Sequence, residues 1–230
     1  MSIETSLQQV YENIRLAAAR SGRNADDIQL IAVTKTMPVY VVNEAIASNV
    51  TRLGENKAQE ICDKYDKVSH PVEWHMIGHL QSNKAKDILD KVSLIHSLDR
   101  MSLAKELEKR ASGLDLKVKV LVQVNVAEED SKHGLRLPEV IPFLEKMVDF
   151  PHISINGLMT MAPYVKDPNK ARPVFRQLRE LRDEIVDRNF SHLAMDVLSM
   201  GMTNDYQVAV EEGATMVRIG SAIFGERRYN

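Results

Sequence analysis

The strongest constraint on the fold is a regular alternation of short apolar runs with longer amphipathic stretches. The apolar runs, rich in Val, Ile, Leu and Met, have the length and composition of strands. They cover residues 29–35, 52–56, 73–79, 94–98, 117–126, 153–161, 193–200 and 216–219. Helical periodicity marks the intervening stretches, at residues 38–48, 57–68, 83–90, 101–112, 137–149, 169–189 and 205–212. Strict alternation of this kind predicts a parallel sheet covered by helices.

A further amphipathic helix is predicted before the first strand. Apolar residues recur at helical spacing from Ile3 to Ala17, and the pattern stops at Ser21. Runs such as residues 31–33 are apolar on both faces, which is typical of buried parallel strands. These features predict an α/β fold, a single (β/α)8 TIM barrel with an extra N-terminal helix. A doubly wound open sheet is the alternative. Because no linker rich in Gly, Pro or Ser interrupts the chain, we expect one domain over residues 1–230.

Composition points to a small-molecule partner. The 30 Lys and Arg residues nearly balance 32 Asp and Glu, for a net charge of −2, so no basic surface for nucleic acid is indicated. The single cysteine, Cys62, excludes an internal disulfide, and the N-terminus lacks the pattern of a secretory signal. No apolar run reaches the roughly 20 residues that cross a membrane. We therefore expect a cytoplasmic protein with no membrane partner, while composition predicts no oligomeric state.

The first strand leads to a candidate nucleophile. Alternation along residues 31–35 puts Lys35 on the same face as Ile31 and Val33. At the mouth of a barrel, desolvation disfavours the charged ammonium and makes a lysine able to condense with an aldehyde. A solvated lysine that merely ends a strand is the alternative for Lys35 taken alone.

The second and third strands end in polar residues. Gly54 permits close backbone approach, and Asn56 supplies a hydrogen-bond donor and an acceptor, although a polar helix start also fits this segment. His75 and His79 share a face of the third run, but positions four apart on a strand are separated by about 13 Å. That separation is too large for two ligands of one ion, so we predict no metal site here.

The last two strands carry the features of an anion site. Ser199 lies at the end of the seventh run, and Gly220 and Ser221 follow the eighth, where a strand turns into a helix with free backbone N–H groups. Phosphate sites in barrels recur at this place. Arg218 adds a permanent charge for phosphate oxygens or for a ring nitrogen. An aldehyde-reactive lysine together with a phosphate site suggests pyridoxal 5′-phosphate (PLP) as the ligand.

Several ordered segments resemble the YggS/PROSC family of PLP homeostasis proteins. The segments are residues 31–35, 54–56, 77–84, 157–161, 199–202 and 217–225. The resemblance implies a barrel like the N-terminal domain of alanine racemase, with PLP held as a Schiff base on Lys35. It also implies Ser199, Gly220 and Ser221 at the phosphate, Asn56 near the cofactor, and Arg218 at either the ring nitrogen or the phosphate. Ser221 departs from the family's usual Thr but keeps its hydroxyl and its N–H group.

Three functions are compatible with these residues. The family implies a PLP-binding protein of intracellular vitamin B6 homeostasis, with PLP and PLP-dependent apo-enzymes as partners and without catalytic residues. A PLP-dependent amino-acid racemase is the alternative, and it needs a second acid/base opposite Lys35. Only five residues follow Gly225, which leaves no room for the domain that supplies this group in the racemases, although Tyr229 or His79 could replace it. The third function is non-covalent binding of another phosphorylated metabolite.

Overall fold

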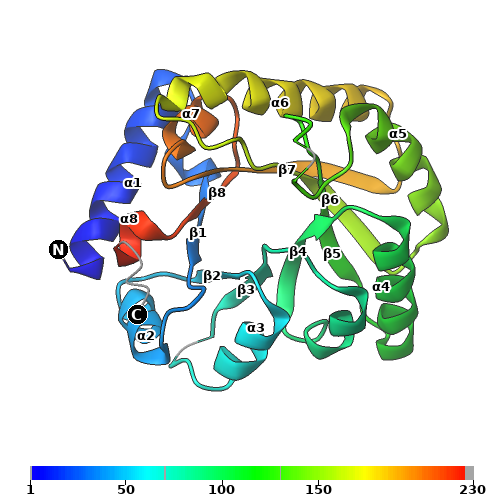
Figure 1. Ribbon diagram of the computed structural model, residues 1–230, viewed down its shortest axis with the longest axis horizontal. Coiled ribbons are helices and arrows are strands. Elements are labelled where there is room, and N and C mark those ends of the chain that lie inside the picture. Colours follow the sequence, from blue (N-terminus) through cyan, green and yellow to red (C-terminus); the bar gives the residue numbers. More distant parts are fainter. Residues whose placement is uncertain (1, 70, 130, 226–230) are drawn as a thin grey trace.

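Eight parallel strands close into a barrel, which confirms the predicted fold (Figure 1). The computed structural model describes residues 2–69, 71–129 and 131–225. Each strand pairs with the next along the chain, and β1 pairs with β8 to complete the ring. The strands are β1 Gln29–Val33, β2 Arg52–Glu55, β3 Glu73–Met76, β4 Val92–Leu98, β5 Val118–Gln123, β6 Ile153–Met159, β7 Leu193–Met202 and β8 Met216–Ile219. The open sheet, the alternative, is thereby excluded.

The helices form an outer layer around the strands (Figure 1). They are α1 Ile3–Arg20, α2 Val39–Ala47, α3 Ala58–Tyr65, α4 Met101–Leu114, α5 Leu137–Lys146, α6 Arg172–Asp187, α7 Tyr206–Glu211 and α8 Ser221–Phe224. The predicted leading helix is α1, which packs on α7 and α8 at the seam where the barrel closes. The Ser2 hydroxyl caps it by accepting the Thr5 N–H at 3.2 Å. Of the helices in the described ranges, none is both long enough and apolar enough to cross a membrane.

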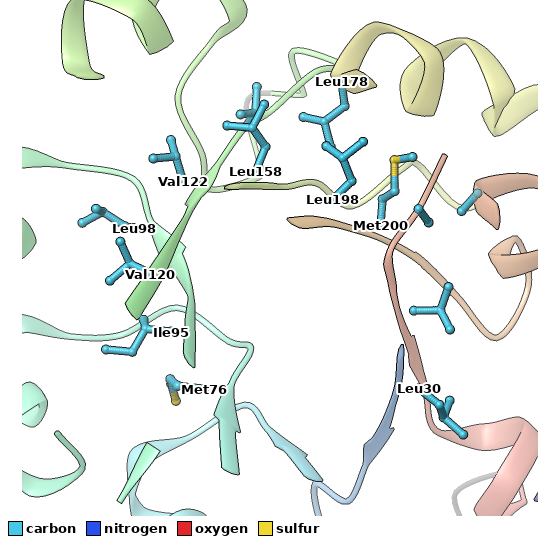
Figure 2. Packing of buried hydrophobic residues seen from close by; sticks show 14 of the residues in the cluster. Leu30, Met76, Ile95, Leu98, Val120, Val122, Leu158, Leu178, Leu198 and Met200 are labelled. Carbon is cyan, nitrogen blue, oxygen red and sulfur yellow. The ribbon is translucent and has the colours of Figure 1, made fainter. Parts of the chain in front are cut away.

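Alternating side chains build two separate apolar layers. Leu30 and Ala32 of β1 belong to a large cluster between the strands and the helices. Figure 2 shows part of this outer layer, where Leu178 of α6 approaches Leu198 of β7. The alternate residues face inward and fill the barrel with Ile31, Val33, Ile77, Leu94, Leu121, Met159 and Met216. This inner plug leaves the carboxyl ends of the strands as the place for a site.

Two parts of the sequence-based prediction need correction. The helix expected at residues 83–90 is instead a 3-10 helix, η2 Ser82–Asp87. Ala85 and Ile88 are both buried and lie three residues apart, which is one turn of a 3-10 helix. Some strands also end earlier than predicted: β1 ends at Val33 and β3 at Met76. Lys35 and His79 therefore lie in loops after the strands.

Candidate functional site

A cavity of about 720 Å³ lies at the carboxyl ends of the barrel strands. Its lining includes five of the six residues singled out from the sequence: Lys35, Asn56, Arg218, Gly220 and Ser221. The sixth, Ser199, is fully buried beneath Arg218. The volume lies within the usual range of small-molecule sites. Closure of the barrel thus brings residues from the first and last strands to one cavity.

Lys35 lies in a tight turn after β1. The Met37 N–H donates to the Thr34 carbonyl at 3.0 Å, and Thr36 adopts a left-handed conformation with φ of 65°. Such a conformation is uncommon for a β-branched residue and needs support from its surroundings. That support comes from α3, because the Thr36 N–H donates to Glu60 Oε2 at 2.8 Å.

A buried ion pair holds the start of this turn. Lys64 Nζ of α3 donates to the Thr34 carbonyl at 2.8 Å and to Glu55 Oε1 at 2.7 Å. The Thr34 hydroxyl donates to the same Glu55 oxygen at 2.7 Å. Glu55 is fully buried, and its Oε2 has no hydrogen-bond partner within the described residues. This ion pair fixes the backbone immediately before Lys35.

We expect the stability of the protein to fall as pH rises toward neutrality because of Glu55. Burial raises the pKa of the Glu55 carboxyl to about 7, against the opposing effects of Lys64 and Thr34. The unfolded chain has a Glu pKa of about 4.3. The folded state holds the proton more tightly, so this stabilisation is complete below about pH 4.3 and is lost as pH rises through about 7. The free energy of unfolding in urea, measured at pH 5 and at pH 7.5, should differ less between the two pH values in Glu55→Gln than in wild type. Identical pH profiles in the two proteins would exclude the effect.

Asn56 is positioned by a close backbone contact between β2 and the end of β3. A Cβ atom on Gly78 would lie 2.3 Å from the Asn56 carbonyl oxygen, which no real side chain tolerates. Only glycine therefore allows the chain after β3 to pass so near Asn56. The half-buried Asn56 side chain lies on the cavity wall one residue beyond β2.

Arg218 brings a buried positive charge to the cavity. Its Nη1 donates to Ser199 Oγ at 2.5 Å, and its Nη2 donates to the Thr160 carbonyl at 2.8 Å. Burial lowers the pKa of the guanidinium to about 10, while the Asp205 carboxylate acts in the opposite direction. Arg218 therefore remains cationic at neutral pH, in a fixed orientation.

A chain of buried polar groups continues from Arg218 into the barrel. Ser199 Oγ lies 3.0 Å from His96 Nδ1, and His96 Nε2 lies 2.9 Å from His75 Nδ1. Burial lowers the pKa of His75 to about 4 and that of His96 well below its usual value. Both imidazoles are therefore neutral at physiological pH. Arg218 can only donate, so Ser199 Oγ accepts from it, and the direction of the Ser199–His96 bond follows the tautomer of His96.

The start of α8 offers backbone donors to the cavity. The Ile223 and Phe224 N–H groups bond to the Gly220 carbonyl, so the helix begins directly after Gly220. The Ser221 and Ala222 amides come before these two, at helix positions whose N–H groups have no carbonyl partner within the helix and point toward its N-terminus. The exposed Ser221 side chain lies on the same cavity. Together these groups suit an anion.

Sequence reasoning missed several residues of this arrangement. His96 interrupts the apolar run of β4, and a polar residue on the inner face of a strand was the available signal. Lys64 gave no signal, because a lysine in an amphipathic helix is usually solvated. Of the two histidines considered as a metal pair, His75 lies inside the barrel and His79 lies at the cavity. Tyr229 lies outside the described residues.

Sequence comparisons identify relatives along nearly the whole chain. Residues 5–228 match the family model of the alanine racemase N-terminal domain. A pyridoxal phosphate homeostasis protein of Aquifex aeolicus (strain VF5) is 44% identical over 224 residues, which cover 97% of each chain. The protein of the same name from Escherichia coli (strain K12) is 35% identical, covering 99% of this chain and 98% of its own.

Solved structures agree with this relationship. PipY of Synechococcus elongatus PCC7942, solved with PLP bound, superposes with a TM-score of 0.80 at 32% identity and covers 93% of this chain and 99% of its own. Alanine racemase of Clostridium difficile 630 has a TM-score of 0.73 at 14% identity, covering all of this chain and 58% of the racemase, which shows a shared fold only. The chain belongs to the family of pyridoxal phosphate homeostasis proteins, whose barrel is that of the alanine racemase N-terminal domain.

Proposed function

We propose that this protein binds PLP through Lys35 and takes part in intracellular PLP homeostasis, as one domain over residues 1–230. The observation that carries the proposal is the meeting of a lysine, a buried guanidinium and helix-start amides on one cavity. These groups match the aldehyde, the ring nitrogen and the phosphate of PLP, which is bound in the PipY relative. When bound, PLP supplies an aldehyde that condenses with the Lys35 amine to a Schiff base, with loss of water.

The other residues have distinct proposed roles. The amides after Gly220 and the Ser221 hydroxyl bind the phosphate at the start of α8. Arg218 lies two residues before Gly220 on the same cavity, so it would face the ring nitrogen of a ligand whose phosphate lies at Gly220. Ser199 acts through Arg218, to which it is hydrogen-bonded, rather than at the phosphate. Asn56 contacts the ligand from the wall between Lys35 and the third strand.

These roles favour storage of PLP over catalysis. Arg218 is cationic and donates only, so a ring nitrogen facing it stays unprotonated and the ring is a weaker electron sink. We therefore propose that no residue of the site is catalytic. Release to PLP-dependent apo-enzymes is the step that a homeostasis role requires.

Absorbance and mass spectrometry of the purified protein test the proposal. We expect a visible Schiff-base band and, after borohydride reduction, one pyridoxyl group per chain. Pyridoxal, which lacks the phosphate, should bind much more weakly than PLP. If added PLP produces no Schiff-base band, covalent binding is refuted. If other phosphate esters bind tightly while PLP produces no such band, the non-covalent alternative is supported.

The racemase alternative has its own measurement. Alanine and other amino acids incubated with the protein and PLP should show negligible stereoinversion. Robust turnover would replace the storage role with an enzymatic one.

A further inference from the structure

Three potential metal ligands converge at the rim of the cavity, on loops that follow consecutive strands. His79 follows β3, Asp99 directly follows β4, and His133 lies between β5 and α5. One ligand atom from each lies within 4.8 Å of the other two. The two histidines also line the cavity that contains Lys35. No sequence pattern indicates this cluster, because its members lie far apart along the chain.

The surroundings of Asp99 leave one of its oxygens directed to the cluster. Arg100 Nη1 donates to Asp99 Oδ1 at 2.6 Å, while Oδ2 lies 3.7 Å from His79 Nδ1. The Arg100 guanidinium is itself held by the Leu80 carbonyl, which Nη2 contacts at 2.6 Å. The Asp99 side chain is only 7% exposed. Such a partner on the outer oxygen orients a carboxylate in the way that supporting residues orient metal ligands.

The histidine pair is similarly well defined. The His79 and His133 rings stack with centroids 4.0 Å apart and planes inclined by 19°. The loop that carries His133 is anchored to β5, because Gln123 Nε2 donates to the His133 carbonyl at 3.0 Å. A Cβ atom on Gly134 would lie 2.8 Å from the Asn125 nitrogen, so glycine permits this close approach. Two imidazoles are thus kept together at the rim.

The Arg100 guanidinium brings a positive charge near the cluster, which opposes cation binding. Its ion pair, however, is with Asp99 Oδ1 and not with Oδ2, the oxygen near His79.

We propose that His79, Asp99 and His133 form a binding site for a borderline divalent cation such as Zn²⁺. Two imidazole nitrogens and one carboxylate oxygen suit this class, whereas Mg²⁺ and Ca²⁺ prefer oxygen ligands throughout. At metal–ligand distances of about 2.0–2.2 Å, a tetrahedral site needs ligand atoms about 3.4 Å apart. Because a bound ion lies in the plane of each imidazole that holds it, the exposed His79 ring has to turn out of the stack with His133 to close this gap. The fourth position faces the cavity and is filled by water. None of the three residues is a proposed PLP ligand, so the metal site does not depend on the proposed function.

Zinc binding to the full-length protein tests the site. After treatment with a chelator and dialysis, we expect one Zn²⁺ per chain in competition with a chromophoric chelator. Co²⁺ should give the visible absorption of a tetrahedral site. In His79→Ala/His133→Ala, we expect the affinity for Zn²⁺ to fall at least about 100-fold. Loss of a residue that only orients a metal ligand costs about 10–100-fold, so a fall of this size or more indicates that ligands themselves are lost. The Co²⁺ absorption should disappear, while the metal-free thermal midpoint stays near that of wild type.

His152→Ala is the matched control. His152 Nδ1 lies 2.7 Å from Glu108 Oε1, so this residue also forms an imidazole–carboxylate pair, with a similar exposure of 33%. We expect it to leave Zn²⁺ affinity and the Co²⁺ spectrum unchanged. The proposal is overturned if wild type binds no stoichiometric Zn²⁺, if the double variant retains wild-type binding, or if His152→Ala weakens binding equally.

Discussion

Replacing Lys35 by alanine is expected to abolish covalent capture of PLP while leaving the barrel folded. Lys35 lies outside β1 and lines the cavity, so its truncation leaves the pairing of β1 with β2 and β8 intact. The amine is the proposed site of condensation, and an alanine offers no nucleophile. Borohydride-fixed pyridoxyl, measured by mass spectrometry, should fall from one group per chain to an undetectable level. Residual PLP should remain exchangeable, held without a covalent bond by the phosphate site, Arg218 and Asn56.

Lys57→Ala is the control for this variant. Lys57 is an exposed lysine next to Asn56, and it is close enough to the rim to report non-specific modification. It should keep the full pyridoxyl mass and the Schiff-base band. If Lys35→Ala retained the same band, the covalent site would have to be assigned to another lysine.

Replacing Lys64 by methionine is expected to destabilise the whole protein and to weaken its hold on PLP. The change removes the cation 2.7 Å from the buried Glu55 and the donor to the Thr34 carbonyl. Loss of one partner of a buried ion pair costs about 3–5 kcal/mol when the other partner stays charged. Because burial raises the pKa of Glu55 to about 7, its carboxyl can become neutral near neutral pH, so we expect a loss below this range. Urea unfolding measures the lost free energy of unfolding. A faster dissociation of PLP would show that the turn carrying Lys35 is held less firmly.

Two companion variants make this prediction sharper. Lys67→Met alters an exposed lysine just beyond α3 and should change the free energy of unfolding little. Lys64→Met/Glu55→Gln removes both charges, and we expect it to recover part of the lost stability. Equal unfolding free energies for Lys64→Met and Lys67→Met would show that the buried pair contributes little.

The barrel was predictable because each strand and helix carries its own periodicity. The site was predictable where residues follow a strand directly, as Asn56, Gly220 and Ser221 do. Ser199 was harder, because β7 runs on to Met202 and leaves this residue inside the barrel. Its neighbour across the strands is Met216, a residue of the inner plug.

Other residues could not be found from the chain alone. The sequence around Lys64 predicts a solvated residue of an amphipathic helix. Its amine is buried against Glu55 only because α3 packs against the end of β1. His79 and His133 carry no local pattern that links them. Their stacking depends on how the loops after β3 and β5 fold over the rim. Such contacts follow from the closed ring, which local periodicity does not encode.

The pairing of β1 with β8 has a consequence for biosynthesis. Lys35 is made early, but Gly220 and Arg218 reach it only when β8 has docked against β1. A nascent chain on the ribosome therefore has no complete ligand cavity until its last strand has emerged. A ligand that contacts both strands binds only the finished ring, so it shifts the folding equilibrium toward closure by mass action. A larger supply of such a ligand should therefore raise the yield of folded protein, because its binding depends on the pairing of β1 with β8.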